Sequence, residues 1–208
     1  MRILKINPHK PEKELIKLAS DVLKNDGIVV YPTDTLYGIA ANALSRRAIL
    51  EVYKVKGRDY RKPLSVAFHS LLQVKKYVEF NSIALRLAKK FLPGPLTIIL
   101  PMKHMFPKEL TFGSEKVGVR IPDNKISLKL IKECGFPITA TSANISGNND
   151  PITAEDAISQ IGSKVDMILD GGKCKYSKPS TVVEILDKIK ILREGVINGG
   201  SIYKFVKV

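Results

Sequence analysis

A strand-like run leads into a polar loop in the stretch Ile28-Val29-Val30-Tyr31-Pro32-Thr33-Asp34-Thr35-Leu36-Tyr37-Gly38. The β-branched residues before Tyr31 are typical of a buried strand, and Pro32 ends it. Residues 11–26 carry apolar side chains at helical i, i+3, i+4 spacing, and Gly27 then favours a helix end. A helix followed by a buried strand that ends in a polar loop is typical of α/β folds.

The same alternation continues along the chain. Further helices are predicted at residues 46–55, 82–91 (capped by Asn81) and 127–133, and Thr153 with Asp156 forms a capping-box pattern that opens another. Further strands are predicted at residues 64–68, 96–100, 117–121, 137–141, 165–169, 181–186 and 189–192. No internal repeat or linker divides this pattern. We therefore expect one α/β domain over residues 1–208, with strand order open and a mixed sheet as compatible as a parallel one.

The composition is that of a protein with a large core. The chain has 208 residues, of which 44% are hydrophobic, so neither disulfides nor structural metals are needed to stabilise it. Cys134 and Cys174 form no C-x-x-C motif, and we expect reduced thiols. No apolar run is long enough to span a membrane, and residues 1–7 are too short and charged for a signal peptide. We expect a soluble, cytoplasmic protein without membrane contact.

The charge balance is strongly basic. Lys and Arg number 34 against 20 Asp and Glu, a formal net charge of +14. This surplus favours polyanions such as nucleic acid or nucleotide phosphates, but a solvated lysine-rich surface is equally compatible. His9, His69 and His104 lack metal-ligand spacing, so no protein metal site is expected.

Three polar segments follow predicted strands or helices. Residues 31–38 offer hydroxyls and a carboxylate, residues 54–63 contain five cations around Gly57, and residues 139–147 end a strand in small polar groups. Each segment also has an ordinary explanation. Residues 31–38 can be a capped turn, residues 54–63 a solvated or RNA-binding basic loop, and residues 139–147 an Asx or Ser/Thr turn. Because α/β folds bind ligands in such loops, the three segments are candidates for one site. The chain has no Walker P-loop or G-x-G-x-x-G motif, so a nucleotide site here is of another kind.

Eight motifs in series resemble those of the YrdC family. They are YPTDTLYG (31–38), KGR (56–58), KPL (62–64), PGPLT (93–97), VGVRIP (117–122), TSANISG (141–147), STVVEI (180–185) and LREG (192–195). The resemblance implies a twisted, mixed α/β sheet with flanking helices and a basic groove. It also implies a nucleotidyltransferase that converts L-threonine, bicarbonate and ATP, with magnesium, into threonylcarbamoyl-AMP and pyrophosphate. A partner transferase then passes the threonylcarbamoyl group to an adenosine of tRNA.

The resemblance also implies site residues. Lys56 and Arg58 match a K-x-R pair at the ATP phosphates and are the expected catalytic residues. The implied ATP-binding set is Lys56, Arg58, Lys62, Lys116, Ser142, Asn144, Asp150 and Arg193. The implied threonine-binding set is Thr35, Arg120 and Ser180, with Arg120 on the substrate carboxylate. Some family members have a histidine where this chain has Ala67, with His69 two positions on, so one threonine contact differs. Longer members carry a second domain, and this chain resembles the single-domain form.

Two other functions remain compatible with the sequence. The first is a protein that binds double-stranded RNA or tRNA through a basic groove, without adenylate chemistry. The second is a paralogue that uses a different carbamoyl or acyl-adenylate substrate. The intact S-x-N motif at residues 142–144 favours the synthase over both.

Overall fold

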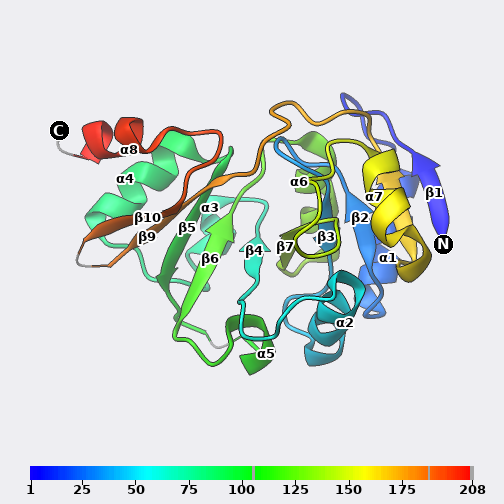
Figure 1. The fold of residues 1–208 in the computed structure, drawn as a ribbon, viewed down its shortest axis with the longest axis horizontal. Helices are drawn as coiled ribbons and strands as arrows, with labels where there is room; N and C mark the ends of the chain where they lie inside the picture. Colours follow the sequence, from blue (N-terminus) through cyan, green and yellow to red (C-terminus); the bar gives the residue numbers. More distant parts are fainter. Residues whose placement is uncertain (105, 187, 207–208) are drawn as a thin grey trace.

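The computed structural model describes residues 1–104, 106–186 and 188–206, and within them ten strands form one sheet (Figure 1). The order across the sheet is β1-β8-β2-β3-β7-β4-β6-β5-β9-β10. The strands are β1 (Arg2–Lys5), β2 (Val29–Tyr31), β3 (Gly38–Ala40), β4 (Ser65–Ala67), β5 (Leu96–Pro101), β6 (Lys116–Arg120), β7 (Ile138–Ser142), β8 (Met167–Asp170), β9 (Thr181–Ile185) and β10 (Ile189–Arg193).

The sheet is mixed, which confirms the predicted α/β class. Strand β8 pairs in parallel with β1 and β2, β4 pairs in parallel with β6, and β5 pairs in parallel with β9. The remaining neighbours are antiparallel. The neighbouring strands β7, β4, β6 and β5 are consecutive along the chain but are not in chain order in the sheet, so side chains from separate segments meet on one face.

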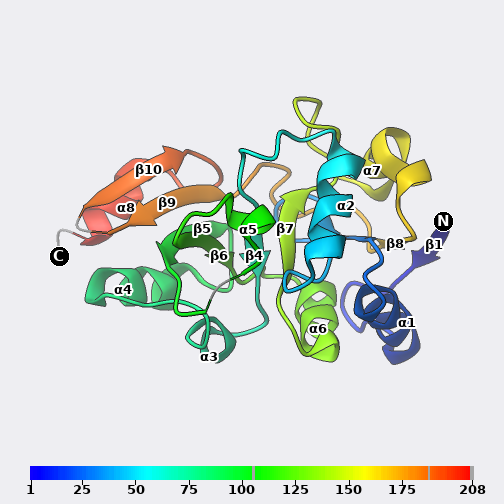
Figure 2. The ribbon, with the colours of Figure 1, turned by 90° about the horizontal axis from the view of Figure 1, so that it is seen from below.

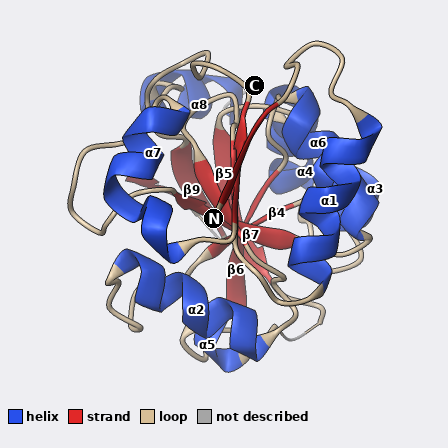
Figure 3. Cartoon of the chain, turned by 90° about the vertical axis from the view of Figure 1, so that its right-hand side faces the viewer, coloured by secondary structure: helices blue, strands red, loops and turns tan. Residues whose placement is uncertain are grey.

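Helices cover both faces of the sheet. Helices α1 (Lys13–Lys24), α3 (Leu71–Val74), α4 (Ser82–Phe91) and α6 (Lys125–Cys134) lie on one side, and α2 (Arg46–Lys56), α5 (Lys108–Thr111) and α7 (Ala154–Ile161) on the other (Figures 2 and 3). Helix α8 (Gly199–Val206) packs beside α4 at one end, and a 3₁₀ turn, η1 (Gly162–Lys164), follows α7. No helix in the described ranges is long and apolar enough to cross a membrane.

The predicted caps explain where several helices begin. Asn81 accepts a hydrogen bond from the Ala84 N–H at the start of α4. Thr153 and Asp156 form a complete capping box at α7, as predicted. Helix α6 begins at Lys125, two residues before the predicted start, because Asn124 accepts hydrogen bonds from the N–H groups of Ile126 and Ser127.

Some elements were not predicted. These are strands β1 and β3 and helices α3, α5 and α8. Strand β3 starts at a glycine after a polar loop, and β1 has mainly exposed side chains, so neither has the apolar pattern of a buried strand. Residues 105, 187 and 207–208 of the expected single domain lie outside the described residues.

Candidate active site

A cavity of about 520 Å³ lies over the central strands. Alternate residues of three strands point into it, as the two-residue period of a strand requires: Thr97 and Ile99 of β5, Lys116, Gly118 and Arg120 of β6, and Ser180, Val182 and Glu184 in and just before β9.

Gly118 keeps this surface flat in the middle. A Cβ atom at Gly118 would lie 2.6 Å from Ser65 Oγ and 3.2 Å from Thr97 Cγ2. Lys116 and Arg120, on either side of Gly118 along β6, are four residues apart, which corresponds to about 13 Å along a strand. The cavity therefore has two separate polar ends along β6.

One end is built around Arg120. Its Nη2 donates to Asp34 Oδ1 at 2.6 Å, and the Asp34 side chain is completely buried. Arg120 Nε and Asp34 Oδ2 have no hydrogen-bond partner among the described residues. The guanidinium is thus held from behind by a buried carboxylate, and Arg120 also lines the cavity.

Hydroxyl groups surround the same end. Thr35 is buried, lines the cavity and lies 3.0 Å from Thr33, oxygen to oxygen, while the Thr33 hydroxyl donates to Leu36 O. Ser180 Oγ lies 3.0 Å from Thr97 Oγ1 and accepts from Arg193 Nη2 at 3.1 Å.

A second group of cations lies nearby at the cavity edge. Arg58 lines the cavity while its guanidinium donates to the carbonyls of Lys62 and Pro63, which fixes the side chain against its own loop. Partial burial lowers the pKa of Arg193; the Asp150 carboxylate acts to raise that pKa, and Arg120 and Arg58 lower it. Arg58, Arg120 and Asp150 therefore share one electrostatic field with Arg193, in which Asp150 is the carboxylate that acts on Arg193 while Asp34 pairs with Arg120.

Lys56 corrects one expectation. The K-x-R resemblance implies a lysine at the ATP phosphates, which requires an accessible side chain, but Lys56 is only 2% exposed and does not line the cavity. Its ammonium donates to Ser142 O, to Asn144 O and to Asn144 Oδ1 at 2.5, 2.8 and 3.0 Å. Burial lowers its pKa to about 8. All three N–H groups of Lys56 are thus used to hold the loop after β7.

That loop presents Ser142 to the cavity. Ser142 Oγ donates to Asn144 Oδ1 at 2.7 Å, and Asn144 Nδ2 donates to the carbonyls of Asn148 and Asn149. Asn144 is buried and, like Lys56, lies behind the cavity wall. The K-x-R and S-x-N motifs therefore meet in space, with Arg58 and Ser142 facing the cavity and Lys56 and Asn144 supporting them.

The other end of the cavity holds an ion pair. Lys116 Nζ lies 2.9 Å from Glu184 Oε1, and their side chains are 37% and 22% exposed. The register places Glu184 opposite Ile99, which in turn lies opposite Gly118.

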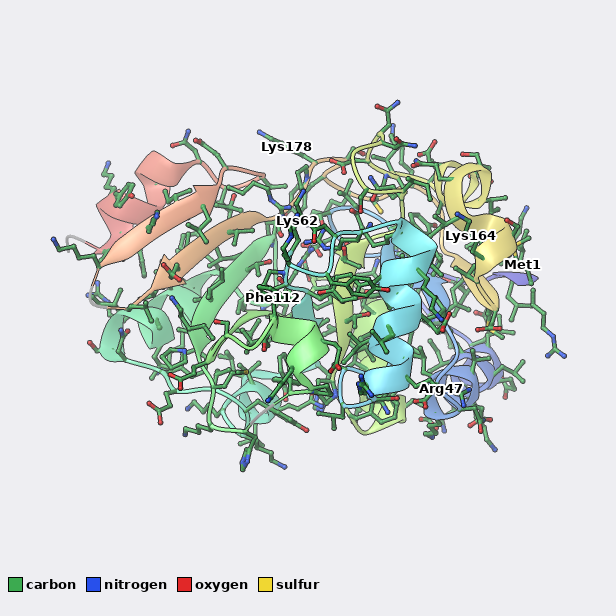
Figure 4. The ribbon with its side chains drawn as sticks, turned by 60° about the horizontal axis from the view of Figure 1, so that its bottom comes forward. Met1, Arg47, Lys62, Phe112, Lys164 and Lys178 are labelled. Atoms are coloured by element: carbon green, nitrogen blue, oxygen red, sulfur yellow. The ribbon has the colours of Figure 1, made fainter. Side chains whose placement is uncertain are left out.

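The structure brings most of the expected residues together. Eight of the sequence-derived positions line the cavity: Thr35, Arg58, Lys116, Arg120, Ser142, Asp150, Ser180 and Arg193. Lys62 is exposed and does not line the cavity; Figure 4 labels it near the middle of the view.

Sequence reasoning did not select Asp34, Thr97 or Glu184. Asp34 is the carboxylate of the candidate segment 31–38, for which a capped turn was the ordinary alternative, but it was not named as a site residue. Thr97 and Glu184 point into the cavity by strand alternation, a signal that becomes usable only once the register is known. The described residues contain no cluster of three His, Cys, Asp or Glu side chains that could hold a metal ion.

Together, the fold and the cavity define an α/β protein whose sheet carries an elongated, arginine-rich site for an anionic ligand. The chain belongs to the Sua5, YciO and YrdC family: the family model described as "Telomere recombination" matches residues 21–195. The resemblance in the motifs is thereby confirmed.

Individual relatives agree with this assignment. A Methanocaldococcus jannaschii protein is 44% identical over 199 residues, which are 95% of this chain and 93% of that protein. The threonylcarbamoyl-AMP synthase of Pyrococcus abyssi is 37% identical over 177 residues, 85% of this chain and 52% of the relative. The crystal structure of P. abyssi Sua5 complexed with L-threonine matches with a TM-score of 0.95 at 34% identity, covering 99% of this chain and 61% of that one. The chain thus spans about half the length of the P. abyssi synthase.

Proposed function

We propose that this protein synthesises threonylcarbamoyl-AMP from L-threonine, bicarbonate and ATP, with release of pyrophosphate. The observation that carries the proposal is the convergence of a buried, carboxylate-backed arginine and a separate arginine-rich edge in one cavity. The first suits an amino-acid carboxylate, and the second suits phosphates. Membership of a family that contains proteins named for this activity supports the same assignment.

The amino acid binds at the Arg120 end in this proposal. The guanidinium, fixed by Asp34, donates hydrogen bonds to the substrate carboxylate in a forked geometry. Thr35 and Ser180 supply hydroxyls for the ammonium group and side chain. Ala67 also lines this cavity and has no polar atom to offer, so the amino acid is held without the histidine found in some relatives.

The phosphates bind at the edge formed by Arg58, Ser142 and Arg193. Arg58 and Arg193 neutralise the phosphate charge, and the Ser142 hydroxyl is positioned by the loop that Lys56 holds. Asp150 is the carboxylate in this field, so it would hold a magnesium ion together with phosphate oxygens, which is the usual way proteins bind magnesium. Bound there, magnesium would neutralise phosphate charge.

The chemistry requires orientation more than covalent help from the protein. The threonine amine and bicarbonate form a carbamate and water; a carbamate oxygen then bonds to the α-phosphorus while the bond to pyrophosphate breaks. Arg120 fixes the nucleophile, and Arg58 and Arg193 stabilise the charge that develops on the leaving group. A nucleophile–base pair in the protein is not needed for this sequence.

Pyrophosphate release tests the proposal directly. Purified protein is incubated with ATP and magnesium, with L-threonine and bicarbonate added singly or together. We expect release only when both are present. Folded protein that releases no pyrophosphate under these conditions, or releases it without threonine, contradicts the assignment.

Two further parts of the proposal concern partners. In this proposal the product passes to a separate threonylcarbamoyl transferase that acts on tRNA, as the family resemblance implies. Direct contact with tRNA or double-stranded RNA is supported by the net charge of +14. Binding to RNA measured against salt concentration tests that contact, since phosphate-driven affinity falls steeply as salt rises.

A further inference from the structure

We propose that the Ser65 hydroxyl holds the carbamate that forms between the two ligand ends of the cavity, and that Gly118 leaves the space for this contact. The inference rests on the proposed function and gives a role to Ser65, which lies outside the eight motifs. It follows from the position of Ser65 on β4, from its neighbours and from its contact with Gly118.

Ser65 lies midway between the amino-acid end and the phosphate edge. Two residues before it, the Pro63 carbonyl accepts a hydrogen bond from Arg58, which belongs to the phosphate edge. Two residues after it, Ala67 lies beside Arg120 in the strand register. Two residues span about 6–7 Å along a strand, so Ser65 is within reach of the ligand atoms that join the amino acid to the phosphates.

The Ser65 hydroxyl is available to a ligand. Ser65 lines the cavity, and its lining neighbours on the same and adjacent strands have no polar side-chain atom: Ala67, Gly118 and Ala140. Within the described residues, the Ser65 hydroxyl has no hydrogen-bond partner, whereas the cavity hydroxyls of Ser142 and Ser180 are bonded inside the protein. A small, apolar floor with one unbonded hydroxyl suits a small polar group of the ligand.

Gly118 controls where this hydroxyl can point. A Cβ atom at Gly118 would lie 2.6 Å from Ser65 Oγ and 3.2 Å from Ser65 Cβ, so an alanine there would displace the hydroxyl. Gly118 lies inside β6 and has no left-handed backbone angle, so the backbone conformation does not itself require glycine. The glycine is instead explained by the space that Ser65 occupies over the strand.

A carbamate is the part of the ligand that suits this hydroxyl. The amino-acid carboxylate has Arg120 and the phosphates have Arg58, so the group left for a neutral donor is the carbamate between them. The hydroxyl can donate to one carbamate oxygen. The other oxygen then stays free to bond to the α-phosphorus while the bond to pyrophosphate breaks. Because the carbamate is an anion, this hydrogen bond is charge-assisted.

Pyrophosphate release at saturating L-threonine, ATP and magnesium, with bicarbonate varied, tests the inference. Ser65→Ala should lower kcat/KM for bicarbonate about 10- to 100-fold, the effect of losing one hydrogen bond to a charged group. Binding of L-threonine and of ATP, each measured alone by calorimetry, should not change, because the hydroxyl contacts neither. Ser82→Ala is the matched control: Ser82 is exposed at the start of α4 and does not line the cavity, so all three quantities should stay as in the wild type.

Gly118→Ala provides a second, independent variant. The added Cβ atom should cause a similar loss of kcat/KM for bicarbonate although the serine is still present. Adding Gly118→Ala to Ser65→Ala should cause little further loss, because the hydroxyl that the Cβ atom displaces is already gone.

Several results would overturn the inference. If the wild-type protein releases pyrophosphate as proposed, unchanged kcat/KM for bicarbonate in Ser65→Ala refutes this inference alone. Weaker threonine binding by Ser65→Ala would place the hydroxyl at the amino acid, and strictly additive losses in the double variant would separate Gly118 from Ser65. If Ser65→Ala does not fold, Ser65→Cys, whose thiol is a weak donor, should show the same bicarbonate-specific loss. Wild-type protein without bicarbonate-dependent release refutes the proposed function and this inference together.

Discussion

Removing the carboxylate behind Arg120 should destabilise the protein strongly. Asp34 has no exposed side-chain surface and Arg120 only 11%, so Asp34→Ala leaves a guanidinium buried without its counter-charge. Breaking a buried pair in this way costs about 3–5 kcal/mol. For a chain of this length, about 2–4 °C of melting temperature is lost per kcal/mol, so we expect a decrease of about 6–20 °C.

Thermal unfolding followed by circular dichroism measures the effect. Asp123→Ala is the matched control, because Asp123 pairs with Lys175 at 3.6 Å on the surface and both side chains are more than half exposed. Such a pair contributes about 1 kcal/mol or less.

A double-mutant cycle with Arg120→Met then isolates the interaction. If the pair is coupled, the double variant Asp34→Ala/Arg120→Met is more stable than the sum of the single effects predicts. Strict additivity, or a melting temperature for Asp34→Ala close to that of the control, refutes the reasoning.

Three further predictions concern Lys56, Arg58 and the cap of α7. Lys56→Met should lower the melting temperature, because it leaves buried acceptors on Ser142 and Asn144 unsatisfied, at about 1–3 kcal/mol each. Arg58→Met should leave the melting temperature unchanged and weaken ATP binding. Equal melting temperatures for the two variants would contradict the supporting role of Lys56. Because burial lowers the pKa of Lys56 to about 8, ATP affinity should fall as pH rises through 8. In the unfolded chain this lysine keeps its proton until about pH 10.4. Between about pH 8 and 10.4 the unfolded state therefore binds more protons than the folded state, so this group raises the free energy of unfolding as pH rises. Calorimetry at pH 7 and 9 measures the ATP affinity, and denaturant titration at the same pH values measures the free energy of unfolding. Thr153→Ala should cost about 0.5–2 kcal/mol in denaturant unfolding, with no change in ATP affinity.

The fold class could be predicted because its local signals agree with its packing. Helices α1, α4 and α7 have both the apolar spacing and the end signals that specify them, and the structure has them close to the predicted positions. Strand β3 could not be predicted in this way, because its short Gly38–Ala40 segment is stabilised by pairing with β2 and β7. The β7 partner lies about a hundred residues away, and no local pattern reports it.

The candidate site was predictable to the extent that its residues lie in recognisable motifs. Asp34 illustrates the limit: its place after Pro32 fits a capped turn, and only the approach of β6 turns it into the partner of Arg120. Glu184 illustrates another limit. On the chain it is one polar residue in an apolar run, and its meaning depends on which strand lies beside it.

The K-x-R motif shows why position in the chain does not determine role. Helix α2 ends at Lys56, and Gly57 takes a left-handed conformation with φ of 56°. The turn at Gly57 separates two cations that are neighbours in sequence: Lys56 points inward to the loop after β7, while Arg58 faces the cavity. The K-x-R resemblance implies that both are phosphate ligands. Lys56 holds the end of β7 that carries Ser142, and Arg58 lines the cavity. Under the proposed function, the two cations would act on the same phosphates by different routes.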